Sequence, residues 1–293
     1  MNVLFGLLAA LFWGGGDFSG GMAAKHAGGT VGGALRIILL SHMASFCVLT
    51  AIATLRSDAF PHGAPLVAGL LAGFLGGVSL TLFYIALARG AMGASAAVSG
   101  LLAAAIPAIV SIASDGFPGR TRLAGFLLTG AAIWLIAAAP TGVLEAPQKS
   151  SASTMALAVL AGVGFGLYFV ALKVAGAGGF FWPLATARMG SLSTCSLLLL
   201  GISMRSSLAG IAEGRINGGA ILWALSTAVL DTSGNLLFLG ATRAGRLDVA
   251  AVLACMYPAS TILLAAWVLK ERFSRRQGVG LGLAAAAVVL ITH

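Results

Sequence analysis

The sequence predicts an all-α membrane protein with ten transmembrane helices arranged as two inverted five-helix repeats. The first observation is composition: of 293 residues, 59% are hydrophobic and only 9% are charged, whereas about 25% of a typical soluble domain is charged. The second is that the apolar residues fall into long runs, each close to the ~20 residues that a helix needs to cross a bilayer. These runs are too long and too continuous for the strands of a membrane barrel, which alternate over ~10 residues.

Charges and turn residues divide the chain into the ten predicted spans. The spans cover residues 3–24, 30–54, 64–88, 91–113, 123–140, 153–175, 179–204, 218–241, 247–269 and 276–292. A polar stretch at residues 142–152 lies at the centre of the chain and contains a proline, a lysine and two serines. We interpret it as the linker between a first repeat, residues 1–141, and a second repeat, residues 153–293.

The third observation is that five features recur in both halves in the same order, separated by 148 to 154 residues. The matched positions are Lys25 with Lys173, Arg36 with Arg188, Arg89 with Arg243, Pro107 with Pro258, and Gly125 with Gly278. Each half then holds five helices, an odd number, so the second half must enter the membrane in the opposite sense. Inverted repeats of this kind are typical of secondary transporters, in which two facing states alternate around a midplane site.

Charge and motifs exclude several functions. The net charge of +9 comes from basic residues scattered between apolar runs, which is typical of membrane-interface anchors rather than of nucleic-acid binding. The three cysteines have no CxxC spacing and the four histidines no metal-ligand spacing, so we expect neither a metal nor another cofactor. Motifs of zinc hydrolases, serine hydrolases and phosphate-binding loops are missing, and we do not expect an enzyme.

Two carboxylates, Asp17 and Asp231, are the only acidic residues deep within predicted spans. A charge at the bilayer centre costs ~2.5–3.5 kcal/mol even on the mildest scale, so it usually faces a partner, the bundle interior or water. At the matching positions of the opposite repeat stand Phe165 and Gly77, so the fold does not require these acids twice. We therefore favour substrate or proton binding by at least one of them over a purely structural pairing.

Glycines interrupt the span that carries Asp17, in the run Trp13-Gly-Gly-Gly-Asp17-Phe-Ser-Gly-Gly. Interior glycines weaken a helix, and freed backbone groups in a membrane must line a cavity or be covered by neighbours. The same residues also permit close helix packing, and both interpretations stay open. A matching glycine cluster occurs at residues 162–166. Two further glycine series predict helix contacts: Gly69, Gly73 and Gly77 in the third span, and Gly278 and Gly282 in the last.

Other residues at interior depth are candidates for ligand contacts or gating. Ser79, Tyr84, Ser99, Tyr168, Asn235 and Tyr257 offer hydrogen bonds either to a ligand or to a neighbouring helix. Pro107 and Pro258 each remove one helical hydrogen bond near the middle of a span, which predicts either a hinge or a static bend. Because Arg36 and Arg188 occupy equivalent places in both repeats, a structural or gating role is favoured over substrate contact, and either side chain can extend to the membrane interface.

The segment Leu269-Lys-Glu-Arg-Phe-Ser-Arg-Arg-Gln-Gly278, followed by an Ala/Gly-rich helix, resembles the EamA-type repeat of the drug/metabolite transporter superfamily. The first half departs from this pattern at residues 114–120. The resemblance implies export of amino acids and other metabolites from a bacterium, with both termini in the cytoplasm. It also implies a central cavity formed by spans one, three, four, six, eight and nine, which maps onto Trp13, Asp17, Ser79, Tyr84, Ser99, Tyr168, Asp231, Asn235 and Tyr257.

The sequence thus predicts a multi-pass secondary transporter of the bacterial inner membrane that exports amino acids or related small metabolites by alternating access. Its expected partners are a small-molecule substrate and membrane lipids, without nucleic acid. Two alternatives stay open: efflux of hydrophobic cationic compounds, and an intramembrane enzyme that modifies lipids. The distribution of basic residues points weakly against cytoplasmic termini.

Overall fold

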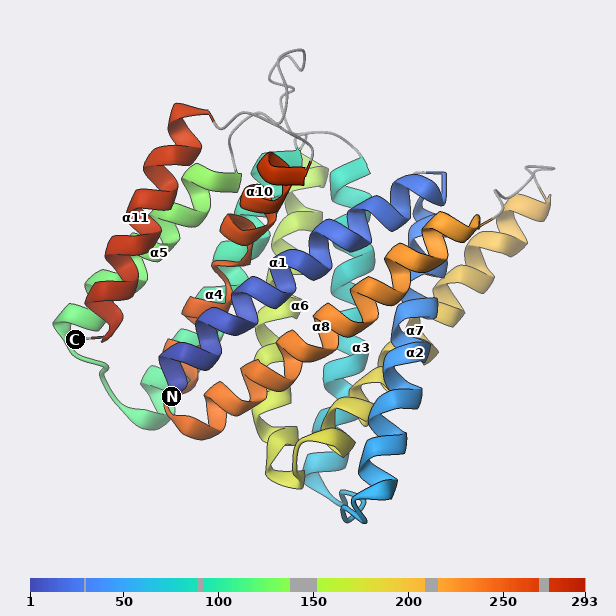
Figure 1. Cartoon of the computed structure of the whole chain (residues 1–293), viewed down its shortest axis with the longest axis horizontal. Coiled ribbons are helices and arrows are strands. Elements are labelled where there is room, and N and C mark those ends of the chain that lie inside the picture. Colours follow the sequence, from blue (N-terminus) through green and yellow to red (C-terminus); the bar gives the residue numbers. More distant parts are fainter. Residues whose placement is uncertain (29, 89–91, 138–151, 209–215, 269–273, 293) are drawn as a thin grey trace.

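A computed structural model gives the fold of the chain and describes residues 1–28, 30–88, 92–137, 152–208, 216–268 and 274–292 (Figure 1). Within these residues every regular element is a helix. The first half contains α1 (Asn2–His26), α2 (Val31–Leu55), α3 (Ala64–Ala88), α4 (Met92–Asp115) and α5 (Arg120–Ala137). The second contains α6 (Ala152–Ala175), the short 3₁₀ helix η1 (Gly176–Gly178), α7 (Phe181–Leu208), α8 (Gly218–Ala244), α9 (Leu247–Ala254), α10 (Tyr257–Val268) and α11 (Arg275–Thr292).

The predicted fold class is confirmed, because the described chain is all-helical and α1 to α8 are each long and apolar enough to cross a bilayer. The predicted count of ten spans is not confirmed. The ninth predicted span consists of two shorter helices, α9 and α10, and α11 begins with two arginines that lower its hydropathy. The linker predicted at residues 142–152 lies almost entirely outside the described residues.

The two prolines differ in their effect. Pro107 lies inside the continuous helix α4. Pro258, by contrast, is the second residue of α10, after α9 has ended at Ala254. Proline has no N–H to donate to the carbonyl four residues earlier, so the chain starts a new helix here. The two prolines therefore lie in different helical contexts, and a hinge or bend at either of them stays a prediction.

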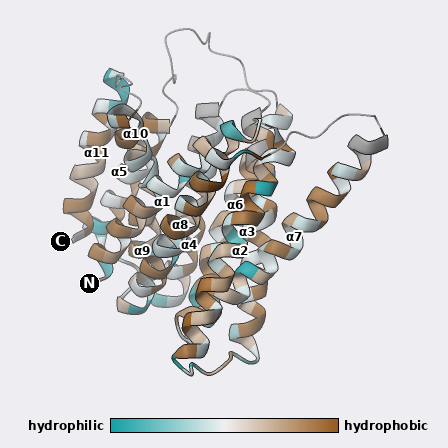
Figure 2. Cartoon of the chain, turned by 45° about the vertical axis from the view of Figure 1, so that its right-hand side comes forward, coloured by the Kyte–Doolittle hydropathy of each residue, from teal (hydrophilic) through white to brown (hydrophobic). Residues whose placement is uncertain are grey.

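Large apolar side chains cover the outside of the bundle. The side chains of Leu127, Leu197 and Leu222 are 70%, 70% and 68% exposed. Figure 2 shows hydrophobic residues along α3, α7 and α11, with hydrophilic residues at the start of α11. A surface of this kind is suited to lipid, which is as apolar as leucine itself.

Each of the larger contacts between helices of the two halves has a counterpart in which the matching helices of the halves have changed places. Helix α1 packs against α8, as α6 packs against α3; α2 packs against α8, as α7 packs against α3. Likewise α1 contacts α9 and α10, as α6 contacts α4, while α5 pairs with α11 and α2 with α7. Both termini lie at one end of the molecule, and α6 begins at the opposite end from α1 (Figure 1). These contacts and directions are what a twofold axis between inverted halves would produce.

The glycines of α1 and α6 lie at equivalent helix contacts. A Cβ atom on Gly14 would lie 2.4 Å from the Cβ of Ser260 in α10, and Gly16 approaches the backbone of α8. In α6, 148 residues later, Gly162 approaches the backbone of α4 and Gly164 the side chain of Ser79 in α3. Both α1 and α6 stay helical through these positions. The glycines thus serve close packing, one of the two interpretations left open above.

The predicted glycine face of α3 is confirmed as a helix contact. Gly69, Gly73 and Gly77 all face α7, and the closest approach is at Gly73, where an added Cβ would lie 1.9 Å from the carbonyl oxygen of Ala187. The backbones of α3 and α7 therefore touch at a point where no side chain fits.

The predicted glycine face of the last helix is wrong. Gly278 and Gly282 have no described heavy atom within 4 Å of an added Cβ. Gly280, on another face of α11, instead approaches Ile136 of α5, 2.7 Å from an added Cβ. A four-residue spacing identifies a helix face but not the face that the neighbouring helix contacts.

Candidate functional site

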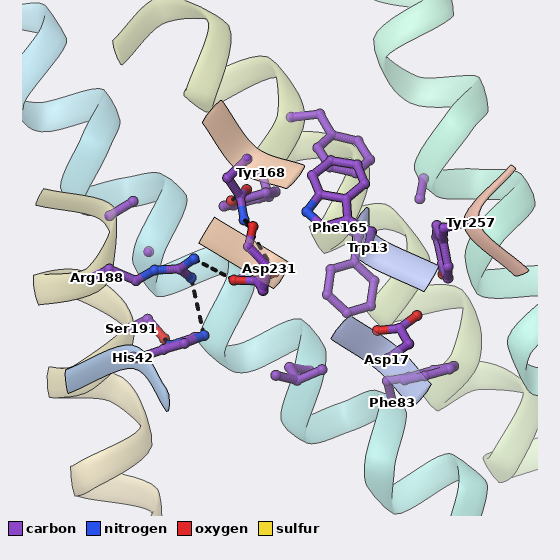
Figure 3. Close-up of a pocket in the computed structure, with 17 residues that line it drawn as sticks. Trp13, Asp17, His42, Phe83, Phe165, Tyr168, Arg188, Ser191, Asp231 and Tyr257 are labelled. Carbon is purple, nitrogen blue, oxygen red and sulfur yellow. Dashed lines mark hydrogen bonds and ion pairs between the residues drawn. The ribbon is translucent and has the colours of Figure 1, made fainter. Parts of the chain in front are cut away.

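A cavity of about 160 Å³ lies among α1, α2, α3, α4, α6, α7, α8 and the start of α10 (Figure 3). Six of the nine predicted cavity residues line it: Trp13, Asp17, Tyr168, Asp231, Asn235 and Tyr257. The other lining residues are His42, Gly73, Gly76, Leu80, Phe83, Ala103, Phe165, Phe169, Ala187, Arg188 and Ser191. Helices α2 and α7 therefore contribute to the cavity, beyond the six spans that the resemblance implied.

Two predicted cavity residues lie elsewhere, at helix contacts. Ser79 is 1% exposed and its hydroxyl faces Gly164 of α6, while Ser99 is 2% exposed and its backbone faces Gly162. Neither residue is part of the cavity wall. The third, Tyr84, belongs to α3, but its side chain lies outside what the structure describes. Both serines are buried as predicted, but they face a neighbouring helix and not the cavity.

A hydrogen-bonded network forms one side of the cavity. Arg188 of α7 forms an ion pair with Asp231 of α8, and its Nη1 donates to Nε2 of His42 in α2 at 3.1 Å. Asn235 donates to Oδ1 of Asp231 at 3.2 Å and accepts a hydrogen bond from the hydroxyl of Tyr168. The network joins four helices from both halves of the chain.

Arg188 and its repeat partner lie in different surroundings. Arg188 is only 7% exposed and lines the cavity. Its matched residue, Arg36, is half-buried and is not among the lining residues. Equivalent positions in the two repeats therefore have different surroundings, because only one of them faces the cavity.

The other side of the cavity carries Asp17, which is exposed. No hydrogen bond or ion pair joins its carboxylate to the residues that the structure describes. Aromatic side chains lie near it in Figure 3, where Tyr257 and Phe83 are beside Asp17. Gly16 brings α1 so close to α8 that an added Cβ would lie 3.4 Å from the backbone nitrogen of Asp231.

Packed aromatic rings form part of the cavity wall, one helical turn from Asp17 toward the N-terminus of α1. Trp13 stacks on Phe169 with ring centroids 5.3 Å apart, and Phe238 lies 4.8 Å from Phe169. All three are buried within the main hydrophobic core. Trp13 and Phe169 also line the cavity, so this part of its wall is made of packed aromatic side chains.

A polar cluster joins the two halves at the end of the molecule that carries the termini. Arg246, which precedes α9, donates to Asp248 at 2.7 Å and to the backbone carbonyls of Asp115 and Gly116 at the end of α4, at 3.0 and 2.6 Å. Lys173 of α6 lies 3.6 Å from Asp115. We call these residues, Arg246, Asp248, Asp115 and Lys173, the Arg246 cluster.

The Arg246 cluster is held by a buried acid. Asp248 is fully buried, and its hydrogen bonds raise the pKa of Arg246 above the ordinary value for arginine. Arg246 therefore keeps its charge, which is favourable beside the carbonyls at the C-terminal end of a helix. The backbone of Arg246 also accepts a hydrogen bond from Asn2 at 3.1 Å, which ties the start of α1 to the same point.

A bundle of membrane-spanning helices around an internal cavity with charged walls defines a class of integral membrane proteins that includes the solute transporters. Within the chain, residues 152–293 match the model of the EamA-like transporter family. This match indicates a membrane transporter of small solutes. It agrees with the resemblance to the drug/metabolite transporter superfamily that was drawn from the same half of the sequence.

A solved structure described as "Crystal structure of protein" is similar over 99% of this chain and 96% of its own, with a TM-score of 0.71 and 19% sequence identity. At that level of identity the likeness shows a shared fold alone. No curated protein matches the sequence significantly.

Proposed function

We propose that the protein is a secondary transporter that exports amino acids or related small metabolites across the bacterial inner membrane by alternating access. One observation carries the proposal: the cavity presents the carboxylate of Asp17 on one side and the guanidinium of Arg188 on the other (Figure 3). These two groups are complementary to the ammonium and carboxylate groups of an amino acid.

The size of the cavity favours a small solute. Its volume of about 160 Å³ is close to that of an engineered cavity of ~150 Å³ that holds benzene. Sites for drug-sized ligands usually have ~300–1,000 Å³. The aromatic wall, which includes Phe83, Phe165 and Tyr257, suits an apolar side chain on the solute.

Alternating access is supported by the relation between the halves. The exchangeable helix contacts and the equivalent glycine contacts of α1 and α6 fit two repeats, residues 1–141 and 153–293, related by a twofold axis in the membrane plane. In the proposed cycle, the Arg246 cluster holds the end with the termini closed in this conformation. We place that end in the cytoplasm, as the resemblance implies, so that the described state is closed toward the cell interior.

Efflux of hydrophobic cations is the second candidate, and one observation favours it. Asp231 already pairs with Arg188, so an ionised Asp17 leaves the cavity with one unbalanced negative charge. A cation beside a carboxylate and several aromatic faces gains cation–π attraction as well. No feature of the described residues favours the third alternative, an enzyme that modifies lipids.

A matched panel of labelled solutes separates these candidates. The purified protein is placed in liposomes, and uptake is measured for phenylalanine, leucine, N-acetylphenylalanine, phenethylamine and phenyltrimethylammonium. If the site recognises both the ammonium and the carboxylate group, the free amino acids are transported. N-acetylphenylalanine, which lacks the ammonium group, is then rejected. Transport of the two carboxylate-free cations alone would favour cation efflux. Transport of none of them would contradict both candidates.

Alternating access requires the Arg246 cluster to open, which gives a further prediction. Arg246→Lys keeps a charge beside Asp248 but loses the hydrogen bonds to the α4 carbonyls, and Lys173→Met removes the contact with Asp115. We expect amide hydrogen exchange at residues 247–254 to become about tenfold faster in the double variant, a factor that corresponds to ~1.4 kcal/mol.

The control for this prediction is Arg120→Gln, which removes an exposed positive charge at the start of α5, on the same end of the molecule. It should leave exchange at residues 247–254 as in the original protein. Equal exchange in the double variant and the control would show that the Arg246 cluster does not hold this end closed.

A further inference from the structure

His42 lines the cavity, although the sequence did not predict it, because the four histidines have no metal-ligand spacing and His42 has no histidine at its repeat position. It lies near the middle of α2, and its two ring nitrogens have different neighbours. Nε2 lies 3.1 Å from Nη1 of Arg188, and Nδ1 lies 2.7 Å from the hydroxyl oxygen of Ser191. Both partners belong to α7, in the other half of the chain.

The donors and acceptors of this arrangement allow one protonation state. Arginine is only a donor, so Nε2 of His42 must accept the hydrogen bond from Arg188. The imidazole is then neutral and carries its proton on Nδ1, from which it donates to Ser191. A protonated ring would place a donor against the Nη1 donor of Arg188, so a proton and Arg188 exclude each other at Nε2.

The hydrogen bond to His42 fixes the plane of the guanidinium. Arg188 is anchored at Nη2 by Asp231 and at Nη1 by His42, while its Nε is buried without a hydrogen-bond partner among the described residues. With one anchor alone, the guanidinium could turn about that single bond. Asp231 and His42 lie on different helices, and together they hold the guanidinium in the cavity wall, although its Nε has no hydrogen-bond partner among the described residues.

A neutral acceptor suits this position better than a charged one. Asp231 already supplies one carboxylate to Arg188, and a second carboxylate in place of His42 would outweigh the single positive charge. The cavity wall would then repel an anionic group. A neutral imidazole orients the guanidinium without adding a second negative charge, so Arg188 and Asp231 together stay neutral.

We propose that His42 is a positioning residue of the binding site: its neutral imidazole, protonated on Nδ1, holds Arg188 in the orientation that binds the carboxylate group of the substrate. This inference rests on the proposed transport of amino acids, and it adds a residue and a protonation state that the transport proposal does not require. The other charged and titratable groups of the cavity are Asp17, Asp231, Tyr168 and Tyr257.

The protonation state is tested without any substrate. The protein is labelled with ¹⁵N-histidine and reconstituted in lipid, and the signal of His42 among the four histidines is assigned by comparison with His42→Asn. We expect the chemical shifts of a neutral ring with the proton on Nδ1. A charged ring, or a proton on Nε2, would overturn the inference whether or not the protein transports amino acids.

The positioning role is tested with two substitutions. Each of them keeps one of the two hydrogen bonds of the imidazole, either that to Arg188 or that to Ser191. Glutamine is long enough to place an amide oxygen near the position of Nε2 and can accept from Arg188. Asparagine reaches only to the position of Nδ1 and can donate to Ser191 alone. For phenylalanine, we expect His42→Asn to raise the half-saturation concentration about tenfold, as for the loss of one hydrogen bond to a charged group, and His42→Gln to raise it by less.

The readout that separates positioning from structure is the substrate without a carboxylate. For phenethylamine, the half-saturation concentration should be the same in His42→Asn as in the original protein, provided that this amine is transported or competes with phenylalanine. An equal rise in the half-saturation concentration for both solutes would overturn the inference. So would a larger rise for phenylalanine in His42→Gln than in His42→Asn. If neither solute is bound by the original protein, the transport proposal fails, and the ¹⁵N measurement still decides the protonation state of His42.

Discussion

Asp17→Asn is expected to reduce transport at least about tenfold while the protein stays folded. The carboxylate is exposed to the cavity and has no ion pair among the described residues, so it is free to bind the ammonium group of a solute or a proton. A hydrogen bond to a charged group contributes ~1.5–3 kcal/mol, which is roughly 10- to 150-fold in affinity. Asparagine keeps the size of the side chain and removes only the charge.

Stability separates Asp17 from the other deep carboxylate. We expect Asp17→Asn to leave the thermal unfolding midpoint unchanged or higher, because a charge at membrane depth no longer has to be kept from the lipid. Asp231→Asn should lower the midpoint, since it breaks the ion pair and leaves the buried Arg188 without its anion. Transport at the original rate and pH dependence in both variants and in the double variant would refute a functional role for these carboxylates.

Gly73→Val is expected to prevent stable folding. A Cβ atom at this position would lie 1.9 Å from the carbonyl oxygen of Ala187, and a backbone carbonyl cannot turn away unless α3 and α7 separate. Overpacking usually costs ~1–3 kcal/mol and occasionally more, and we expect the upper end here because backbone meets backbone. The measurement is the free energy of unfolding in mixed micelles, with Gly73→Ala as a milder variant.

Gly282→Ala is the matched control for the glycine prediction. An added Cβ at Gly282 meets no described heavy atom within 4 Å, so alanine there should raise helix stability by up to ~1 kcal/mol. A Gly73→Ala protein as stable as the Gly282→Ala protein would contradict the close contact between α3 and α7.

The sequence predicted the fold class because apolar runs of spanning length, separated by charges, have few alternatives in a membrane. It did not predict the break after Ala254 in the ninth span. Pro107 and Pro258 looked equivalent in the sequence, yet one lies within a helix and the other near the start of a new one. Whether a proline bends a helix or ends it depends on what its neighbours can pack against, and single-chain patterns do not contain that information.

For the site, burial within the bundle could be predicted from the sequence, but the direction in which each side chain points could not. Asp17 and Asp231 were identified because a carboxylate at membrane depth is costly wherever it points. Ser79 and Ser99 are buried but face glycines of α6, a contact between segments far apart in the sequence. The contact of His42 with Arg188 is likewise between helices that are far apart in the sequence, so the sequence alone does not predict it. An ionisable residue near the middle of α2 was the one signal that could have identified it.

The Arg246 cluster makes the two halves unequal, and this inequality has a consequence for the thermodynamics of the proposed transport cycle. Arg246 and Asp248 correspond to residues 92–97 of the first half, which contain no charged residue. A perfectly symmetric carrier would spend equal time open to each side when empty. Among the described residues, the Arg246 cluster holds one end closed, and in the proposed cycle it biases the empty carrier toward the state that opens at the other end. In the proposed cycle, solute gradients set the direction of net flux, and this bias sets the side to which the empty carrier is open for most of the time.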